Sequence, residues 1–169
     1  MRHLVGLVMV LGLCACPPVE ESDPRPPNLD ARRCVGSTDA ATETRQLRVG
    51  SMTDDAFVAY TEGESVSVIQ GFQGGYMITP SIEIERDPGD PGELCLMVRI
   101  QNTTASVELA PGIYASILFE NDGGVLRSDP IYDLLSFDSD ELVGVSLVLD
   151  VEVESADFRA AQTVRLTLQ

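Results

Sequence analysis

Acidic residues gather at the predicted turns of this chain, where their carboxylates can bind a cation. Calcium takes about six to eight oxygen ligands, and loops that meet at one end of a β fold can supply them. The acidic run best placed for this is Asp138, Asp140 and Glu141. Its spacing does not match an EF-hand loop, and turns need Asp, Asn, Pro and Gly for their own geometry. These three residues are therefore a candidate Ca²⁺ site, with an ordinary acidic turn as the alternative.

A second candidate site is the glycine-rich segment Gln73, Gly74 and Gly75. Glycine has no Cβ, so two glycines in succession let a ligand approach the backbone closely. We therefore treat these three residues as a candidate ligand-binding loop. The alternative is that the glycines serve only a tight turn between two strands.

The N-terminus has the layout of a secretory signal. A basic start, Met1-Arg2-His3, is followed by an apolar run from Leu4 to Ala15, and small residues stand before the expected cleavage point. The run is too short to cross a bilayer as a helix, which needs about 20 residues. The stretch Leu13-Cys14-Ala15-Cys16 resembles the bacterial lipobox, which implies that residues 1–15 are a signal peptide cleaved before Cys16.

The lipobox resemblance also implies a lipid anchor. Cys16 would carry a diacylglycerol thioether and an acylated amine, and each buried CH₂ contributes about 0.8 kcal/mol to membrane binding. Pro17 follows instead of Asp, which in the lipoprotein sorting rule implies the outer membrane, facing the periplasm or the cell surface. One alternative is an ordinary secreted protein. The other is modification of Cys14, which would place Leu13 where a small side chain is expected.

Two residue types are missing from the chain after Ala15. The only histidine is His3, in the predicted signal, and all 11 basic residues are arginine. This excludes Ser-His and Cys-His dyads, His-ligated zinc, a Schiff-base lysine and a P-loop. A hydrolase with two catalytic carboxylates is still an alternative, but no pair of acidic residues stands out. We therefore expect a non-catalytic protein, with Ca²⁺ as the only cofactor considered. The net charge of −16 argues against nucleic acid as a partner.

Cys34 and Cys95 are an even pair once Cys14 is removed and Cys16 is acylated. In an oxidising compartment such a pair is expected to form a disulfide. The alternative is two free thiols. Residues 16–44 contain five prolines and favour an extended tether, which leaves residues 45–169 as the folded domain.

Apolar residues alternate with polar ones along much of the domain, which is typical of strands with one buried face. This alternation predicts strands over 57–60, 65–69, 76–78, 82–84, 94–101, 113–119, 125–128, 142–154 and 163–168.

Turn residues connect these strands. A hairpin is expected to join 57–60 to 65–69, and Asn121-Asp-Gly-Gly124 predicts another, because Asn and Gly tolerate positive φ. Asp129-Pro130 is typical of a helix start, so a helix of one or two turns is expected over 131–135, with a strand as the alternative. Strands of this number and length predict an all-β fold, an antiparallel immunoglobulin-like β-sandwich. A closed barrel of the same strands is the alternative.

The segment Gly71-Phe-Gln-Gly-Gly75-Tyr-Met77, with the strands that follow, resembles predicted lipoproteins of myxobacteria and their relatives. Those proteins carry a Gly-x-Gln-Gly-Gly-x-His segment in a β-sandwich domain, and their biochemical role is undefined. The resemblance covers residues 45–169 and implies fold and location. Met77 stands where they often have histidine, so a ligand role of that histidine does not carry over to this chain.

These features together predict a cell-envelope lipoprotein without catalytic activity, displayed on a tether as a binding or structural module. Its expected partners are the lipid bilayer, through the acyl chains of Cys16, and an unknown component of the envelope. The first alternative is a Ca²⁺-dependent module that binds a ligand or carbohydrate, and the second is the carboxylate-pair hydrolase.

Overall fold

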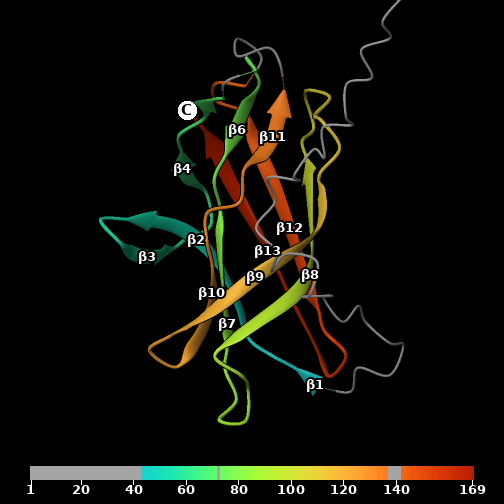
Figure 1. Ribbon diagram of the computed structural model, residues 1–169. Coiled ribbons are helices and arrows are strands. Elements are labelled where there is room, and N and C mark those ends of the chain that lie inside the picture. Colours follow the sequence, from blue (N-terminus) through green and yellow to red (C-terminus); the bar gives the residue numbers. More distant parts are fainter. Residues whose placement is uncertain (1–42, 72, 137–141) are drawn as a thin grey trace, which may run out of the picture. The chain divides into compact units, whose positions relative to one another are not determined.

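The computed structural model describes residues 43–71, 73–136 and 142–169 (Figure 1). In these ranges 62% of the residues lie in strands and none lie in a helix, so the all-β prediction is confirmed. The predicted signal peptide, nearly all of the predicted tether and the candidate Ca²⁺ residues Asp138, Asp140 and Glu141 lie outside the described residues. Within the described ranges, no helix has the length and apolar character needed to cross a membrane.

Ten strands form one large sheet and three form a small one. The large sheet has the order β1-β13-β12-β8-β9-β10-β7-β2-β3, and β4 also pairs with β13; the small sheet has the order β11-β6-β5. The strands are β1 (Glu43–Thr44), β2 (Leu47–Thr53), β3 (Ala56–Ala59), β4 (Glu64–Val66), β5 (Ile69–Gln70), β6 (Tyr76–Ile78), β7 (Ser81–Glu85), β8 (Glu93–Thr103), β9 (Ile113–Asp122), β10 (Val125–Ser128), β11 (Asp133–Ser136), β12 (Ser146–Glu154) and β13 (Phe158–Leu168).

The large sheet is mixed and curled. Antiparallel pairing dominates, but β1 and β4 both run parallel to β13, at its opposite ends. Only Arg45 and Gln46 separate β1, on β13, from β2, which lies near the other end of the strand order. The two ends of the sheet must therefore approach each other, and the backbone N–H of Val49 in β2 indeed donates to Oε1 of Gln162 in β13 at 2.6 Å. The finer prediction of an immunoglobulin-like sandwich stays a prediction.

The inner face of the curled sheet is the hydrophobic core. In β12 the side chains of Leu147, Leu149, Val151 and Val153 are at most 1% exposed, while the residues between them are more accessible. This is the two-residue period expected of a strand with one buried face. Each buried side chain of this size contributes about 1.5–3 kcal/mol of transfer free energy, so the long central strands hold the domain together.

The predicted hairpin at Asn121–Gly124 is confirmed. β9 and β10 pair as antiparallel neighbours on either side of it, and Gly123 and Gly124 have φ values of 61° and 102°. The terminal strand predicted over 163–168 is confirmed as the second half of β13.

The predicted hairpin between 57–60 and 65–69 is wrong. β3 pairs with β2 through a turn at Asp54 and Asp55, both of which have positive φ, and β4 pairs with β13. The carboxylate of Glu64 accepts a hydrogen bond from the backbone N–H of Thr61. The turn between β3 and β4 thus carries the chain across to β13 instead of back onto β3.

Two further predictions need correction. The helix expected over 131–135 is wrong, because this segment includes the strand β11, whose Leu135 is fully buried. The strand expected from residue 142 begins only at Ser146. Before it, Gly144 has a φ of 79° and Val143 is 73% exposed, as in a turn.

Gly112 is a position where only glycine fits. A Cβ there would overlap the carbonyl oxygen of Ile100, on the neighbouring strand β8. We expect Gly112→Ala to lower the free energy of unfolding by about 2 kcal/mol, because a backbone atom cannot move aside as a flexible side chain can. Urea unfolding measures this. Gly89→Ala is the matched control, since a Cβ at Gly89 meets open space, and its effect should stay within about 0.5 kcal/mol. Equal effects of the two substitutions would contradict the prediction.

Candidate functional site

The small sheet carries a row of apolar side chains on one face. Leu134 of β11 and Ile69 of β5 both pair with Met77 of β6. Tyr132 precedes Leu134 by two residues and therefore lies on the same side. Ile78, next to Met77, is buried in the core, so the opposite face of the small sheet packs inward.

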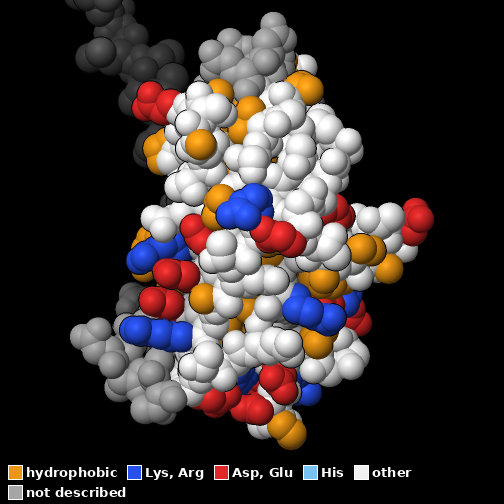
Figure 2. Space-filling view, turned by 180° about the vertical axis from the view of Figure 1, so that it is seen from behind, with side chains coloured by type: hydrophobic (Ala, Val, Ile, Leu, Met, Phe, Trp, Pro, Cys, Tyr) orange, Lys and Arg blue, Asp and Glu red, His pale blue; other side chains and the backbone are white. Residues whose placement is uncertain are grey.

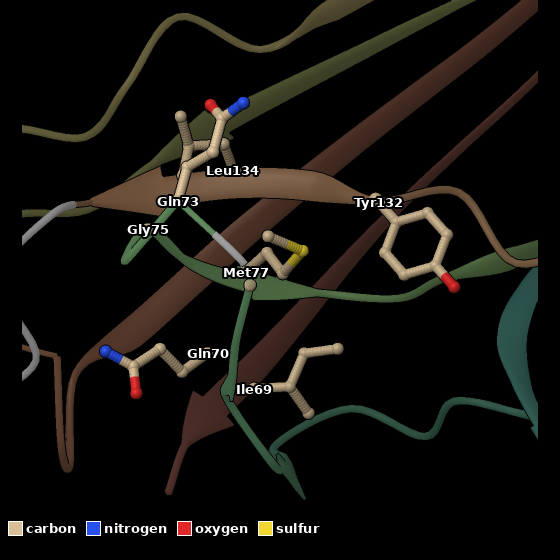
Figure 3. A pocket seen from close by; sticks show the side chains of 8 residues that line it. Ile69, Gln70, Gln73, Gly75, Met77, Tyr132 and Leu134 are labelled. Atoms are coloured by element: carbon tan, nitrogen blue, oxygen red, sulfur yellow. The ribbon is translucent and has the colours of Figure 1, made fainter.

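An open pocket of about 750 Å³ lies over this row (Figure 3). Figure 3 shows Met77 between the side chains from β11 and those from β5. Ile69 is 40% and Tyr132 is 69% exposed, so apolar surface here faces solvent. The pocket is lined by Ile69, Gln70, Gly71, Gln73, Gly75, Met77, Tyr132 and Leu134.

The predicted ligand loop forms one border of this pocket. The backbone N–H of Gly71 donates to the carbonyl of Gly75 at 2.8 Å, and that of Gly74 donates to the carbonyl of Gly71 at 3.0 Å. Gly74 has a φ of 82°, which favours glycine. The segment is thus the tight turn between β5 and β6, and two of the three predicted residues, Gln73 and Gly75, also line the pocket. A role of the loop in binding stays a prediction.

The lining determines which chemistry the pocket can perform. Its polar groups are the amides of Gln70 and Gln73 and the phenol of Tyr132, and none of its described lining residues carries a carboxylate, thiol, imidazole or basic group. Such a lining can hold an apolar body and accept or donate a few hydrogen bonds. It offers neither a general acid–base pair nor a set of metal ligands at neutral pH.

A buried carboxyl group lies directly behind the pocket. Asp133 of β11 is fully buried, and its Oδ2 accepts a hydrogen bond from Nδ2 of Asn102 in β8 at 2.8 Å. Oδ1 of Asp133 and Oδ1 of Asn102 are also buried and have no hydrogen-bond partner among the described residues. Burial raises the pKa of Asp133 to about 6, although the bond from Asn102 acts in the other direction. This pair ties the small sheet to the large one.

Two of the acidic residues at turns are bound to an arginine. The guanidinium of Arg45 donates to Asp87 at 3.0 Å and also to Asp90, and it lies 4.0 Å from the centroid of the Phe158 ring. Burial acts to raise the pKa of Asp90. Hydrogen bonds from Arg45 and from the backbone N–H of Asp87, together with the charges of Arg45 and Arg86, outweigh it, so the pKa lies below its ordinary value. In the structure these two carboxylates are therefore ion-pair partners of Arg45.

A second arginine cluster surrounds Glu83. This glutamate is 3% exposed, and its carboxylate pairs with Arg48 and Arg127. Figure 2 shows arginine side chains lying beside carboxylates over one face of the molecule. Among the described residues, no group of three or more His, Cys, Asp or Glu side chains could hold a metal ion. The Ca²⁺ prediction for Asp138, Asp140 and Glu141 is not tested by this, because they lie outside the described ranges.

The two remaining predicted sites concern cysteine. Cys95 lies in β8 between the inward-facing residues Leu94 and Leu96, so its side chain is on the outer face. It is not a free thiol in the structure. Cys34 lies outside the described residues, so the pairing stays a prediction, and the same holds for the lipidation of Cys16.

Most of the residues that line the pocket were not predicted as site residues from the sequence. Met77 lies in the short strand β6 and Tyr132 lies just before the short strand β11, so neither belongs to a long alternating pattern. Asn102 and Asp133 are far apart in sequence and meet because β11 packs on β8. The comparisons with known proteins add no further residue, since no family model, curated protein or solved structure matches this chain.

Proposed function

We propose that this protein is a non-catalytic binding module of the bacterial cell envelope, anchored through acyl chains on Cys16. In this proposal the pocket over β5, β6 and β11 takes the apolar body of an uncharged small ligand. The observation that carries it is the row of Leu134, Met77 and Ile69 along an open pocket of about 750 Å³. Ile69 is exposed, and Met77 and Leu134 are half-buried. Pockets for small molecules typically measure about 300–1,000 Å³ and are lined mainly by apolar groups.

The charge distribution supports an uncharged ligand. The chain has a net charge of −16, and such a field repels anions. The lining itself is uncharged, so it offers no group to neutralise a charged ligand. Burying an unpaired charge in such a pocket is strongly unfavourable. A neutral, largely apolar molecule with a hydrogen-bonding group that can reach Gln70, Gln73 or Tyr132 fits best.

The place of the pocket within the described fold also supports the proposal. The described chain begins with β1, which pairs with the first residues of β13 (Figure 1). The pocket strand β5 lies near the other end of β13. The backbone N–H of Val68, the residue before β5, donates to the carbonyl of Gln169, which follows the last residue of β13. An eleven-residue strand is about 35 Å long. The first described residues therefore lie at the end of β13 that is remote from β5 and the pocket.

Two finer structural proposals accompany this function. We infer that the strands form an immunoglobulin-like β-sandwich, from their number and length. We infer a Cys34–Cys95 disulfide from the cysteine count and the expected oxidising compartment. Neither is needed for binding in the pocket.

The pocket is tested with the neutral fluorescent probe N-phenyl-1-naphthylamine, titrated at constant pH. We expect Ile69→Asp to weaken probe binding about tenfold or more, because it places a charge in the apolar row. Val58→Asp is the matched control: Val58 is 46% exposed on β3, and the substitution adds the same charge outside the pocket. Val58→Asp should bind the probe like the parent protein. Equal binding by both variants, or none by the parent protein, would refute the proposed function.

A further inference from the structure

β11 connects the pocket to the interior of the domain. Side chains alternate across a strand, so Tyr132 and Leu134 line the pocket while Asp133 between them points into the core. Among the described residues, β11 pairs in its own sheet with β6 alone, and the pairing is irregular between Leu134 and Ser136. The backbone N–H of Ala110 also donates to the carbonyl of Leu135 at 2.7 Å. The contact of Asp133 with Asn102 is the side-chain tie between the pocket-lining strand and β8 of the large sheet.

The Asp133–Asn102 pair is one hydrogen-bond donor short. With Asp133 ionised, the two side chains present three oxygen atoms and a single amide group, and Nδ2 of Asn102 donates to Oδ2 of Asp133. Oδ1 of each residue is buried and has no hydrogen-bond partner among the residues that the structure describes. A buried acceptor without a partner is costly, and a buried charge more so. A proton on Oδ1 of Asp133 removes the charge and supplies the missing donor.

We propose that the protonation state of Asp133 regulates the pocket, an inference that rests on the function proposed above. The neutral carboxyl holds β11 against β8 and keeps Tyr132 and Leu134 in place. The ionised carboxyl favours water entry and displacement of β11, which disturbs both lining residues. Ligand affinity should therefore be higher in acid and lower at neutral pH.

The charged groups on the described elements that pack against β11 do not contribute to the pKa of Asp133. The segment whose Ala110 N–H donates to Leu135 carries Glu108, which is exposed. The only titratable group on β6 is Tyr76, whose hydroxyl accepts a hydrogen bond from Gln70. On β8, Glu93 and Arg99 are exposed and Cys95 is on the outer face, whereas Asn102 is half-buried; Arg99 pairs with Glu152. The raised pKa of Asp133 has burial as its cause and no charged partner.

The direction of the pH dependence follows from the raised pKa. The folded state binds the proton more tightly than the unfolded state does, so stability is greatest below the ordinary value of 3.8 and is lost as the pH rises through about 6. Asp133→Asn removes this loss, because the asparagine amide is neutral and can donate to Oδ1 of Asn102.

The experiment measures N-phenyl-1-naphthylamine binding and urea midpoints between pH 4.5 and 8. The parent protein should lose about tenfold in affinity over this range, an ordinary size for a coupling between sites. Asp133→Asn should bind with the same affinity throughout, and its urea midpoint should exceed that of the parent at pH 8. Asp129→Asn, at an exposed carboxyl of the preceding segment, is the control and should keep the parent profile.

The outcomes separate the two proposals. A flat profile in a parent protein that binds through Ile69 overturns the regulation and leaves the proposed function intact. If Asp133→Asn shows the same pH dependence of probe affinity as the parent protein, the regulation is likewise overturned and the proposed function is left intact. Failure of the parent protein to bind at every pH overturns both.

Discussion

Replacing Cys16 with serine should release the protein from the membrane. The lipobox interpretation predicts that Cys16 carries several acyl chains. Each CH₂ buried in the membrane contributes about 0.8 kcal/mol to binding, so several chains together anchor a protein firmly, whereas a single chain does not. Serine cannot form the thioether, so the chain would carry no anchor. Phase partitioning of cells in Triton X-114 measures the change: the parent protein should enter the detergent phase and Cys16→Ser the aqueous phase.

Cys14→Ser is the matched control for the anchor. Cys14 lies in the predicted signal peptide, which is cleaved before Cys16, and serine keeps a small residue at position 14. This variant should stay in the detergent phase, and its intact mass should show a chain that starts at residue 16 and carries the acyl groups. Release of Cys14→Ser together with retention of Cys16→Ser would move the anchor to Cys14. A parent protein found unacylated in the medium would refute the lipid anchor altogether.

The strand content of the domain could be predicted because its signal is local. Alternation in 146–154 is enough to define β12 and its buried face, and Asn121–Gly124 encodes a hairpin through two glycines at positive φ. In both cases the residues that decide the structure are neighbours in sequence. The same holds for the outward direction of Cys95, which follows from its place between Leu94 and Leu96.

The pairing of strands and the pocket could not be predicted in this way. β4 leaves β3 and joins β13, which depends on the curl of a sheet whose two ends are linked by Arg45 and Gln46. The row of Ile69, Met77 and Leu134 draws on three short strands, the last of them far along the chain. Asp129-Pro130 is a valid local helix signal, but the tertiary environment of Leu135 favours a strand.

Loss of the predicted Cys34–Cys95 bridge should have the largest effect on stability. The bridge would close a 62-residue loop (34 to 95 inclusive), and the chain-entropy estimate for a loop of this length is about 4 kcal/mol. Cys95→Ser should therefore lower the free energy of unfolding by about that amount, measured by urea unfolding under oxidising conditions. The addition of a reductant to the parent protein should have a similar effect.

The strand register and the chain length are compatible with the predicted bridge. Thr44 of β1 pairs with Arg159, Arg159 with Glu154, and Glu154 with Met97 of β8. Three strand spacings and two residues along β8 separate Thr44 from Cys95, a distance of about 16 Å. The ten residues from Cys34 to Thr44 can span about 33 Å when extended, so the chain length allows the two sulfur atoms to meet without any change in the sheet.

A double-mutant cycle distinguishes a bridge from two separate thiols. If Cys34 and Cys95 are bonded, then Cys34→Ser, Cys95→Ser and the double variant should each lose the same free energy of unfolding, because either single substitution already opens the loop. If they are independent, the single effects should be small and should add in the double variant. Additive losses, or a parent protein whose urea midpoint does not respond to reductant, would refute the disulfide. The domain would then derive its stability from its hydrophobic core without a covalent cross-link.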